Sequence, residues 1–276
     1  MIPGHEFAGV VDALGEGVDR FSLGDRVFSP GAITCEECPM CRLGRTNLCE
    51  RAITAGLHRD GALAEFVVVP GRWCYDLPAE IGDRVAPLAQ PMAIAVHALR
   101  RGRSNEEREA IVIGCGGIGA FLVYALTRAD VRVVAADPVE ERREIAVRLG
   151  AARAVEAPSH EQSALVFEVS GTQGGLDAAL RTAKSGGWVV TVGLLKGISQ
   201  YDARHATLRE IDIIGTNALV ADRDVPEALR LLVREPTLWT LVAPHAIALE
   251  RVVDAGFIAM AERRTTSIKT LIDPRL

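Results

Sequence analysis

Residues 110–137 read AIVIGCGGIGAFLVYALTRADVRVVAAD, and this stretch decides the fold. Its periodicity predicts a buried strand over 110–114, a helix over 117–129 and a second strand over 131–137. Four further elements alternate in the same way: a helix over 138–150, a strand over 164–171, a helix over 174–184 and a strand over 186–193. Alternating strands and helices are typical of a parallel sheet with helices on both faces, so we predict a doubly wound α/β domain.

One crossover in this series is unusually short. Only eight residues separate Val155 from Ala164, whereas a crossover between parallel strands normally takes a dozen or more. We therefore expect the helix at this place to be missing or reduced to a turn.

The turn between the first strand and its helix fits the pattern G-x-G-x-x-G. Gly114 allows a tight turn, Gly116 lets the backbone approach a pyrophosphate, and Gly119 lets the helix pack on the strand. The N-terminus of the helix then offers N–H groups and a partial positive charge to the phosphates. The residues that we expect to bind the dinucleotide here are Gly114, Gly116, Gly117, Ile118 and Gly119. A glycine turn in another kind of α/β protein is the alternative.

An acidic residue ends the second strand. Asp137 lies eighteen residues after Gly119, where a carboxylate accepts hydrogen bonds from both hydroxyls of the adenosine ribose. A carboxylate at this place repels a 2′-phosphate, so we predict NAD in preference to NADP. Arg142 and Arg143 on the next helix leave NADP as an alternative.

Four cysteines form a second motif. Cys35, Cys38, Cys41 and Cys49 follow the spacing C-x2-C-x2-C-x7-C in a lobe of about residues 33–50 with little apolar material. Four thiolates close a tetrahedral structural zinc site, and a bound metal would order a lobe that lacks its own core. Exposed thiols, two disulfides or an iron–sulfur cluster are the alternatives, although the bacterial iron–sulfur run has three residues before its fourth cysteine.

Composition limits the class of protein. The chain has 276 residues, enough for two domains or for one domain with a sizeable lobe. Its net charge of −5 without a basic run argues against nucleic-acid binding. Six cysteines, four of them clustered, indicate a reducing compartment. The first residues lack the basic and apolar regions of a secretory signal. The uncharged stretch 110–126 is shorter than the roughly 20 residues of a membrane span, so we expect a cytoplasmic protein without a membrane partner.

The remaining chain is predicted in less detail. The first hundred residues are rich in strands and turns, and Phe7–Val11 and Ala64–Val69 are short β-type runs. A helix is expected from Pro91 to Arg100. The last sixty residues predict helices over 224–234 and 249–262 and a final strand over 267–273.

The whole pattern resembles the zinc-containing medium-chain dehydrogenases of the alcohol dehydrogenase superfamily, especially the polyol branch of sorbitol, threonine and butanediol dehydrogenases. The stretches that carry the resemblance are PGHEFAGVV (3–11), GVDRFSLGDRV (17–27), the four-cysteine lobe, DGALAEFVVVP (60–70), GCGGIG (114–119), GGWVVTVGL (186–194) and SIKTLI (267–272). It implies a GroES-like catalytic domain over 1–98, a Rossmann cofactor domain over 99–217, and a return to the catalytic domain over 218–276.

The resemblance also implies further cofactor contacts. Lys269 would take the place of a basic residue that contacts the pyrophosphate, and Arg142 that of a basic residue near the adenosine ribose. The backbone of Val192, Gly193 and Leu194 would hold the carboxamide. For Lys269, a solvated side chain at a strand edge is the alternative.

A catalytic zinc is implied as well, with His5 as a ligand and Glu6 as a direct or exchanging ligand beside it. The match departs from the family at two places. The family's cysteine ligand and proton-relaying hydroxyl lie before the Gly-His-Glu motif, which starts here at Gly4, so the first strands of the domain and both groups would be absent. Gln90 stands where polyol-branch members have a ligating glutamate. Other candidates are more often structural or solvent-facing: His58, His97, His245 and Cys74, the last expected to be a buried apolar residue.

Two functions of different class follow. The first is a zinc-dependent alcohol or polyol dehydrogenase that transfers a hydride between a secondary alcohol, or its ketone, and NAD(H). The second is an NAD-binding relative that has lost the catalytic zinc and its activity. A zinc-free quinone or enoyl reductase is a third possibility, which the four-cysteine lobe disfavours. The resemblance implies a homodimer or homotetramer with a small-molecule substrate.

Overall fold

The structure is a computed structural model that describes residues 1–102, 107–262 and 264–276. The chain forms two compact units: unit 1 comprises residues 1–93 and 219–276, and unit 2 comprises residues 94–218. The domain boundaries proposed from the sequence, 99 and 217, differ from these limits by a few residues and stay a prediction.

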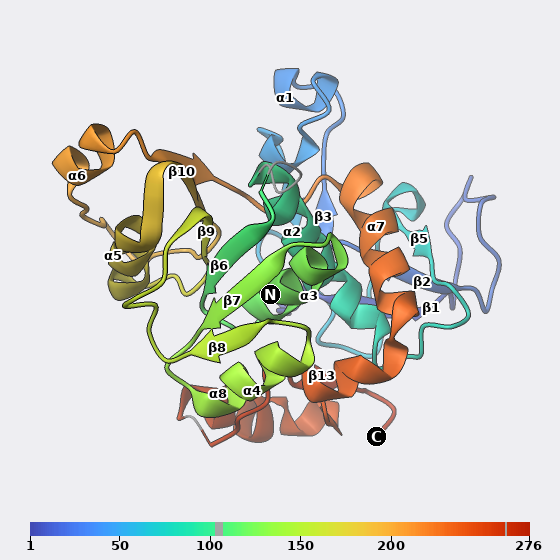
Figure 1. Cartoon of the computed structure of the whole chain (residues 1–276). Helices are drawn as coiled ribbons and strands as arrows, with labels where there is room; N and C mark the ends of the chain where they lie inside the picture. The colour runs from blue at the N-terminus through green and yellow to red at the C-terminus, as the bar shows by residue number, and fades with distance from the viewer. Residues whose placement is uncertain (103–106, 263) are drawn as a thin grey trace. The chain divides into compact units, whose positions relative to one another are not determined.

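Unit 2 contains one six-stranded parallel sheet in the order β11-β10-β9-β6-β7-β8 (Figure 1). Its strands are β6 (Glu109–Ile113), β7 (Arg132–Ala136), β8 (Arg153–Val155), β9 (Ser163–Glu168), β10 (Ala183–Thr191) and β11 (Asp212–Gly215). The chain proceeds from β6 toward one edge and from β9 toward the other. This is the predicted doubly wound sheet, and the prediction is confirmed.

Helices connect these strands. They are α3 (Gly119–Arg128), α4 (Glu140–Arg148), α5 (Gln173–Thr182) and α6 (Ala203–Leu208). Because crossovers between parallel strands are right-handed and the chain winds in opposite directions from the centre, α3 and α4 cover one face and α5 and α6 the other. The face beneath α5 is apolar: Ile111, Val166 and Val189 of the sheet pack with Leu176 and Ala179 of the helix.

The short crossover behaves as predicted. Residues 156–162, all of them described, contain no helix between β8 and β9. The chain has to pass β7 and β6 to reach β9, about 14 Å across the sheet, and to return about 17 Å along the strands to the start of β9, so its ends are about 22 Å apart. Seven extended residues reach about 23 Å, so the connection does not need a helix.

Unit 1 is built from short strands in small sheets. β1 (Phe7–Val10), β2 (Arg26–Ser29) and β5 (Tyr75–Asp76) form an antiparallel sheet, β3 (Ala32–Ile33) pairs with β4 (Ile53–Thr54), and β12 (Ala246–Ile247) pairs with β13 (Leu271–Ile272). The remaining α-helices among the described residues are α1 (Pro39–Arg42), α2 (Ala89–Arg101), α7 (Ala221–Arg234) and α8 (Ala259–Ala261). Residues of α2 belong to both units. Short 3-10 turns cover Thr46–Leu48, Gly71–Trp73, Ala86–Leu88, Pro236–Leu241 and Leu249–Arg251.

Three predictions for unit 1 are corrected. The final strand expected over 267–273 is limited to Leu271–Ile272. Residues 64–69 do not form a strand: the side chains of Phe66 and Val68 are 69% and 79% exposed, and the carbonyl of Val68 accepts a hydrogen bond from the Arg59 side chain at 2.9 Å. A β-type run becomes a strand only when another strand pairs with it, and none of the described strands does so here. The helix expected over 249–262 is a 3-10 turn followed by a π-helix at Val252–Ile258 and the single turn α8.

Candidate metal centre and dinucleotide-binding site

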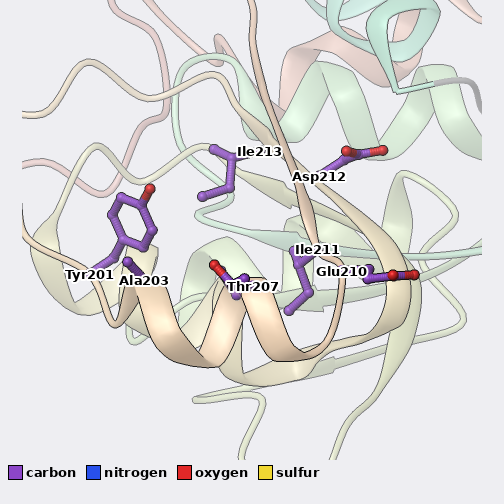
Figure 2. Close-up of a pocket in the computed structure, with 8 residues that line it drawn as sticks. Tyr201, Ala203, Thr207, Glu210, Ile211, Asp212 and Ile213 are labelled. Carbon is purple, nitrogen blue, oxygen red and sulfur yellow. The ribbon is translucent and has the colours of Figure 1, made fainter.

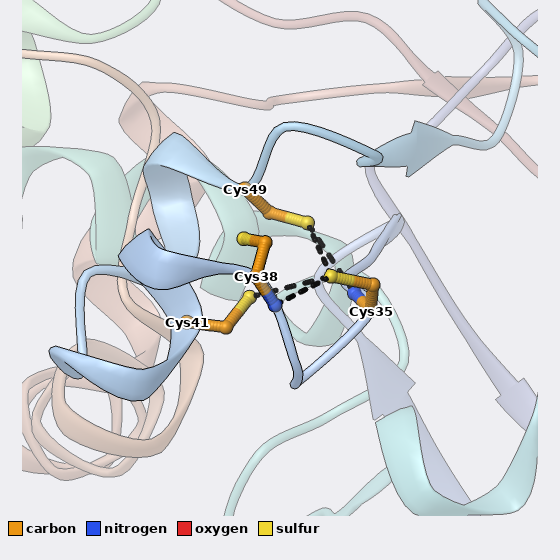
Figure 3. Close-up of side chains that lie close together, drawn as sticks. All are labelled: Cys35, Cys38, Cys41 and Cys49. Carbon is orange, nitrogen blue, oxygen red and sulfur yellow. Dashed lines mark hydrogen bonds between the residues drawn. The ribbon is translucent and has the colours of Figure 1, made fainter.

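The four predicted zinc ligands converge in unit 1. The sulfur atoms of Cys35, Cys38, Cys41 and Cys49 lie within 4.8 Å of one another (Figure 3). Sγ of Cys35 is 3.5 Å from Sγ of Cys49 and 3.9 Å from Sγ of Cys41. Zn–S bonds of about 2.3 Å in a tetrahedron place the sulfurs about 3.8 Å apart. None of the four cysteines forms a disulfide, and the spacing fits a zinc ion.

Local structure brings these thiols together. The β3–β4 hairpin encloses the lobe, Cys38 precedes α1, Cys41 lies within it, and Cys49 follows the 3-10 turn at Thr46–Leu48. Backbone N–H groups, first that of Glu37, lower the pKa of Cys35 to about 6, whereas burial is the main cause that raises the pKa of Cys41 to about 12. Metal binding at neutral pH would therefore displace the proton of Cys41.

The glycine turn of unit 2 is as tight as its pattern requires. Gly114 has a φ of +96°, and a Cβ atom there would lie 2.7 Å from the backbone nitrogen of Ser170. A Cβ atom at Gly119 would collide with the carbonyl oxygen of Gly114. At Gly116 the nearest atom to such a Cβ is Nη1 of Arg142, 3.7 Å away. The turn thus leaves room for a ligand at Gly116 and none at Gly114 or Gly119.

Asp137 supports this turn from below. It follows β7 and is 3% exposed; Oδ2 accepts a hydrogen bond from the Cys115 N–H at 2.8 Å and Oδ1 one from the Val139 N–H at 2.9 Å. Nη1 of Arg142 lies 3.8 Å from Oδ2, and Arg143 donates to the carbonyl oxygen of Asp137 at 2.8 Å. Each carboxylate oxygen has two acceptor positions, so the predicted contact with the ribose remains compatible with these bonds.

The predicted carboxamide site lies just beyond β10. The N–H groups of Val192 and Gly193 donate to the carbonyl oxygen of Glu168 at 2.8 and 3.0 Å, and the side chain of Leu194 is 89% exposed. Sequence reasoning missed Glu168, which ends β9 with its side chain fully buried. An acid at the end of the apolar run ALVFE was the available signal, but burial of a single acid cannot be read from a sequence.

The residues proposed for a catalytic zinc are arranged differently from the expectation. Nζ of Lys269 lies 2.7 Å from both carboxylate oxygens of Glu6, so the predicted pyrophosphate contact and the predicted zinc ligand bind each other. Gln90 is 5% exposed, and its Oε1 has no hydrogen-bond partner among the described residues. In the described part of the chain, the four cysteines are the one group of three or more His, Cys, Asp or Glu side chains close enough to hold a metal.

The other candidate ligands have structural surroundings. Nδ1 of His58 accepts a hydrogen bond from the Thr54 N–H at 3.0 Å within a turn, and His97 is buried on α2. Cys74 is buried as predicted, and burial raises its pKa. His245 lies next to β12.

A separate hollow of about 350 Å³ lies on unit 2 between α6 and the start of β11 (Figure 2). Tyr201, Thr207 and Asp212 are among its lining residues. None of the residues predicted to bind the dinucleotide lines it, so this hollow is distinct from the glycine turn. No helix in the described residues is both long enough and apolar enough to cross a bilayer.

Comparison with known proteins agrees with this geometry. The profile of the alcohol dehydrogenase GroES-like domain matches residues 1–79, and that of the zinc-binding dehydrogenases matches residues 117–234. The chain therefore belongs to the zinc-containing medium-chain dehydrogenases, with a GroES-like domain and a Rossmann domain as predicted. Within this family it falls in the polyol branch, beside sorbitol and threonine dehydrogenases.

Two sequence relatives and one solved structure illustrate the similarity. A sorbitol dehydrogenase from Arabidopsis thaliana is 32% identical over 233 residues, which cover 78% of this chain and 64% of that protein. An L-threonine 3-dehydrogenase from Aeromonas hydrophila is 38% identical over 176 residues, 63% of this chain and 51% of that protein. An alcohol dehydrogenase from E. coli CFT073, crystallised with NADH, has a TM-score of 0.88 at 25% identity and covers 98% of this chain and 83% of its own. The chain spans less than two thirds of the length of either sequence relative.

Proposed function

We propose that the protein is an oxidoreductase that transfers a hydride between a secondary alcohol or polyol, or its ketone, and NAD(H). The observation that carries this proposal is the glycine turn, open at Gly116 and closed at Gly114 and Gly119, with Asp137 fixed beside it at the end of β7. These residues fit a dinucleotide: the N-terminus of α3 presents N–H groups to the phosphates, and the carboxylate retains acceptor positions for ribose hydroxyls. A bound nicotinamide would supply the hydride acceptor.

We propose a structural zinc for the four-cysteine lobe, because the sulfur spacing matches a tetrahedral thiolate shell. The described residues do not fit a catalytic zinc in the same way. Catalytic zinc sites use three protein ligands, whereas His5 and Glu6 are two, and the Glu6 carboxylate is held by Lys269. We derive no step through a metal at this place.

The second candidate function is dinucleotide binding without catalysis, which the Glu6–Lys269 ion pair and the amide of Gln90 favour. Metal analysis of the purified protein, combined with an assay of NAD reduction with sorbitol, threonine and 2,3-butanediol, separates the two. Two zinc ions per chain and turnover of one of these alcohols support the dehydrogenase. One zinc ion per chain, retained NADH binding and no turnover support the non-catalytic protein.

Preference for NAD over NADP, assembly and location belong to the proposal as well. The carboxylate of Asp137 favours NAD, while the guanidinium group of Arg142 beside it supports tolerance of NADP. A homodimer or homotetramer is supported by the family, and light scattering after gel filtration tests it. A cytoplasmic location is supported by the four clustered thiols, which a reducing compartment keeps available for metal.

A further inference from the structure

We propose that Glu168 is the positioning residue of the dinucleotide site: its buried carboxylate holds the loop 169–172 against the glycine turn. The inference rests on the proposed dinucleotide binding and assigns to this chain a residue that fixes the shape of the binding crevice. It concerns unit 2 alone.

Glu168 lies at the centre of the parallel sheet of unit 2. It is the last residue of β9, which pairs with β6 on one side and β10 on the other. The chain winds away from β6 in one direction and from β9 in the other, so the strand order reverses between these two strands. In doubly wound sheets, ligands bind in the crevice at the carboxyl ends of the strands at this point of reversal.

The carboxylate of Glu168 accepts hydrogen bonds from the residues that follow it. Oε1 of Glu168 accepts from the N–H of Ser170 at 2.8 Å, from the N–H of Gly171 at 3.0 Å and from the Ser170 hydroxyl at 2.5 Å. Ser170 Oγ also lies 2.9 Å from Oγ1 of Thr172, the residue that caps α5. One carboxylate oxygen therefore orders the whole turn from β9 into α5.

Glycines pack closely around this carboxylate and the Ser170 that it binds. A Cβ atom at Gly193 would lie 2.8 Å from Oε2 of Glu168, and one at Gly175 would lie 2.6 Å from Oε1. A Cβ atom at Gly114 would lie 2.7 Å from the nitrogen of Ser170. Three glycines from three different segments thus approach the Glu168–Ser170 pair, and the first of them belongs to the turn that would meet the pyrophosphate.

The other carboxylate oxygen of Glu168 adds a cost to the stability of the fold. Glu168 is fully buried, and Oε2 has no hydrogen-bond partner among the described residues. A buried polar atom without a partner destabilises the fold. The gain that we infer from keeping an acid here is the fixed shape of the loop 169–172 at the mouth of the crevice.

The test compares Glu168→Ala with Glu168→Gln, using NADH fluorescence to measure the dissociation constant. We expect Glu168→Ala to weaken NADH binding roughly 10- to 100-fold, because three hydrogen bonds to the loop are lost. Glu168→Gln should stay within about threefold of wild type, because its amide oxygen can accept the same hydrogen bonds. Val166→Ala, in the buried part of the same strand, is the control: it should destabilise unit 2 and leave the dissociation constant unchanged.

Wild-type affinity in Glu168→Ala, or equal losses in the Ala and Gln variants, would overturn the proposal. If Glu168→Ala fails to fold, Ser170→Ala takes its place, with an expected loss of roughly three- to tenfold and wild-type affinity as the contrary result. Amide hydrogen exchange of residues 169–175, measured without ligand, separates the positioning role of Glu168 from the proposed binding of NADH. If wild-type protein fails to bind NADH, the proposed function is wrong, and faster exchange in Glu168→Ala than in Glu168→Gln still supports the positioning role. Equal exchange in both variants contradicts it.

Discussion

At the scale of single residues, Asp137 combines two roles in one carboxylate. It accepts hydrogen bonds from the N–H groups of Cys115 and Val139, and it is proposed to accept the ribose hydroxyls. The first role fixes the position of the group for the second, because a buried carboxylate with two backbone donors has little freedom to rotate.

We expect Asp137→Gly to shift selectivity toward NADPH, because the carboxylate that repels a 2′-phosphate is removed. The ratio of the NADH and NADPH dissociation constants should change by roughly tenfold or more, as loss of one charged contact implies. The unfolding free energy should also fall by about 1–3 kcal/mol, because the buried N–H of Cys115 and the half-buried N–H of Val139 lose their acceptor. Unchanged preference for NADH would count against the ribose assignment.

Cys41 is the most informative of the four thiols, because it is buried and its pKa is raised to about 12 by burial. Cys41→Ser should lower zinc content from one ion per lobe and reduce the melting temperature, since the metal orders a segment with little apolar core. Cys74→Ala, at a buried cysteine outside the lobe, is the control and should retain the zinc. Constant metal content and stability in Cys41→Ser would refute the structural zinc.

At the scale of elements, the close packing of α3 on β6 depends on one missing Cβ atom. Gly119→Ala would place a Cβ atom against the carbonyl oxygen of Gly114, so we expect the turn to open. NADH binding should weaken at least tenfold. The unfolding free energy should fall by about 1–3 kcal/mol, the usual cost of overpacking. Gly174→Ala is the matched control. It lies in the first turn of α5 with open space around its Cβ position, and it should be neutral or slightly stabilising. Equal behaviour of the two variants, measured by thermal unfolding and NADH titration, would contradict this account.

The elements also show what could be predicted from the sequence. The strands β6, β7, β9 and β10 and the helices between them were predictable because their apolar periodicity is local, and the missing helix at 156–162 followed from counting residues. The short elements β8, α6 and β11 were not predicted. The conformation of residues 64–69 could not be predicted in the same way. The pattern that contains Phe66 and Val68 is typical of a strand, but a strand also needs a pairing partner, which the local sequence does not reveal. The π-helix at Val252–Ile258 left no signal that we recognise in the sequence.

Some residues of the candidate sites could be predicted from the sequence, and others could not. The four cysteines and the glycine turn were predictable, because spacing alone defines their chemistry. The Glu6–Lys269 ion pair was not, since it joins residues 263 positions apart. Glu168 was not either, because its importance comes from burial and from glycines of three different segments that approach Glu168 or the Ser170 bound to it.

At the scale of the whole molecule, the two units contribute different chemistry. Unit 1 holds the four-cysteine lobe and the Glu6–Lys269 pair, and unit 2 holds the glycine turn, Asp137 and Glu168. The dinucleotide proposal depends on unit 2, whereas the choice between dehydrogenase and non-catalytic protein depends on the metal content of unit 1. The two questions can therefore be answered by separate measurements.

The central claim is that the crevice at the carboxyl ends of β6 and β9 binds a nicotinamide dinucleotide. Titration of the purified full chain with NADH, followed by nicotinamide fluorescence, tests it most directly. The account predicts saturable enhancement with one site per chain and displacement by NAD. No enhancement up to millimolar NADH, with the sheet shown to be folded by circular dichroism, would contradict it.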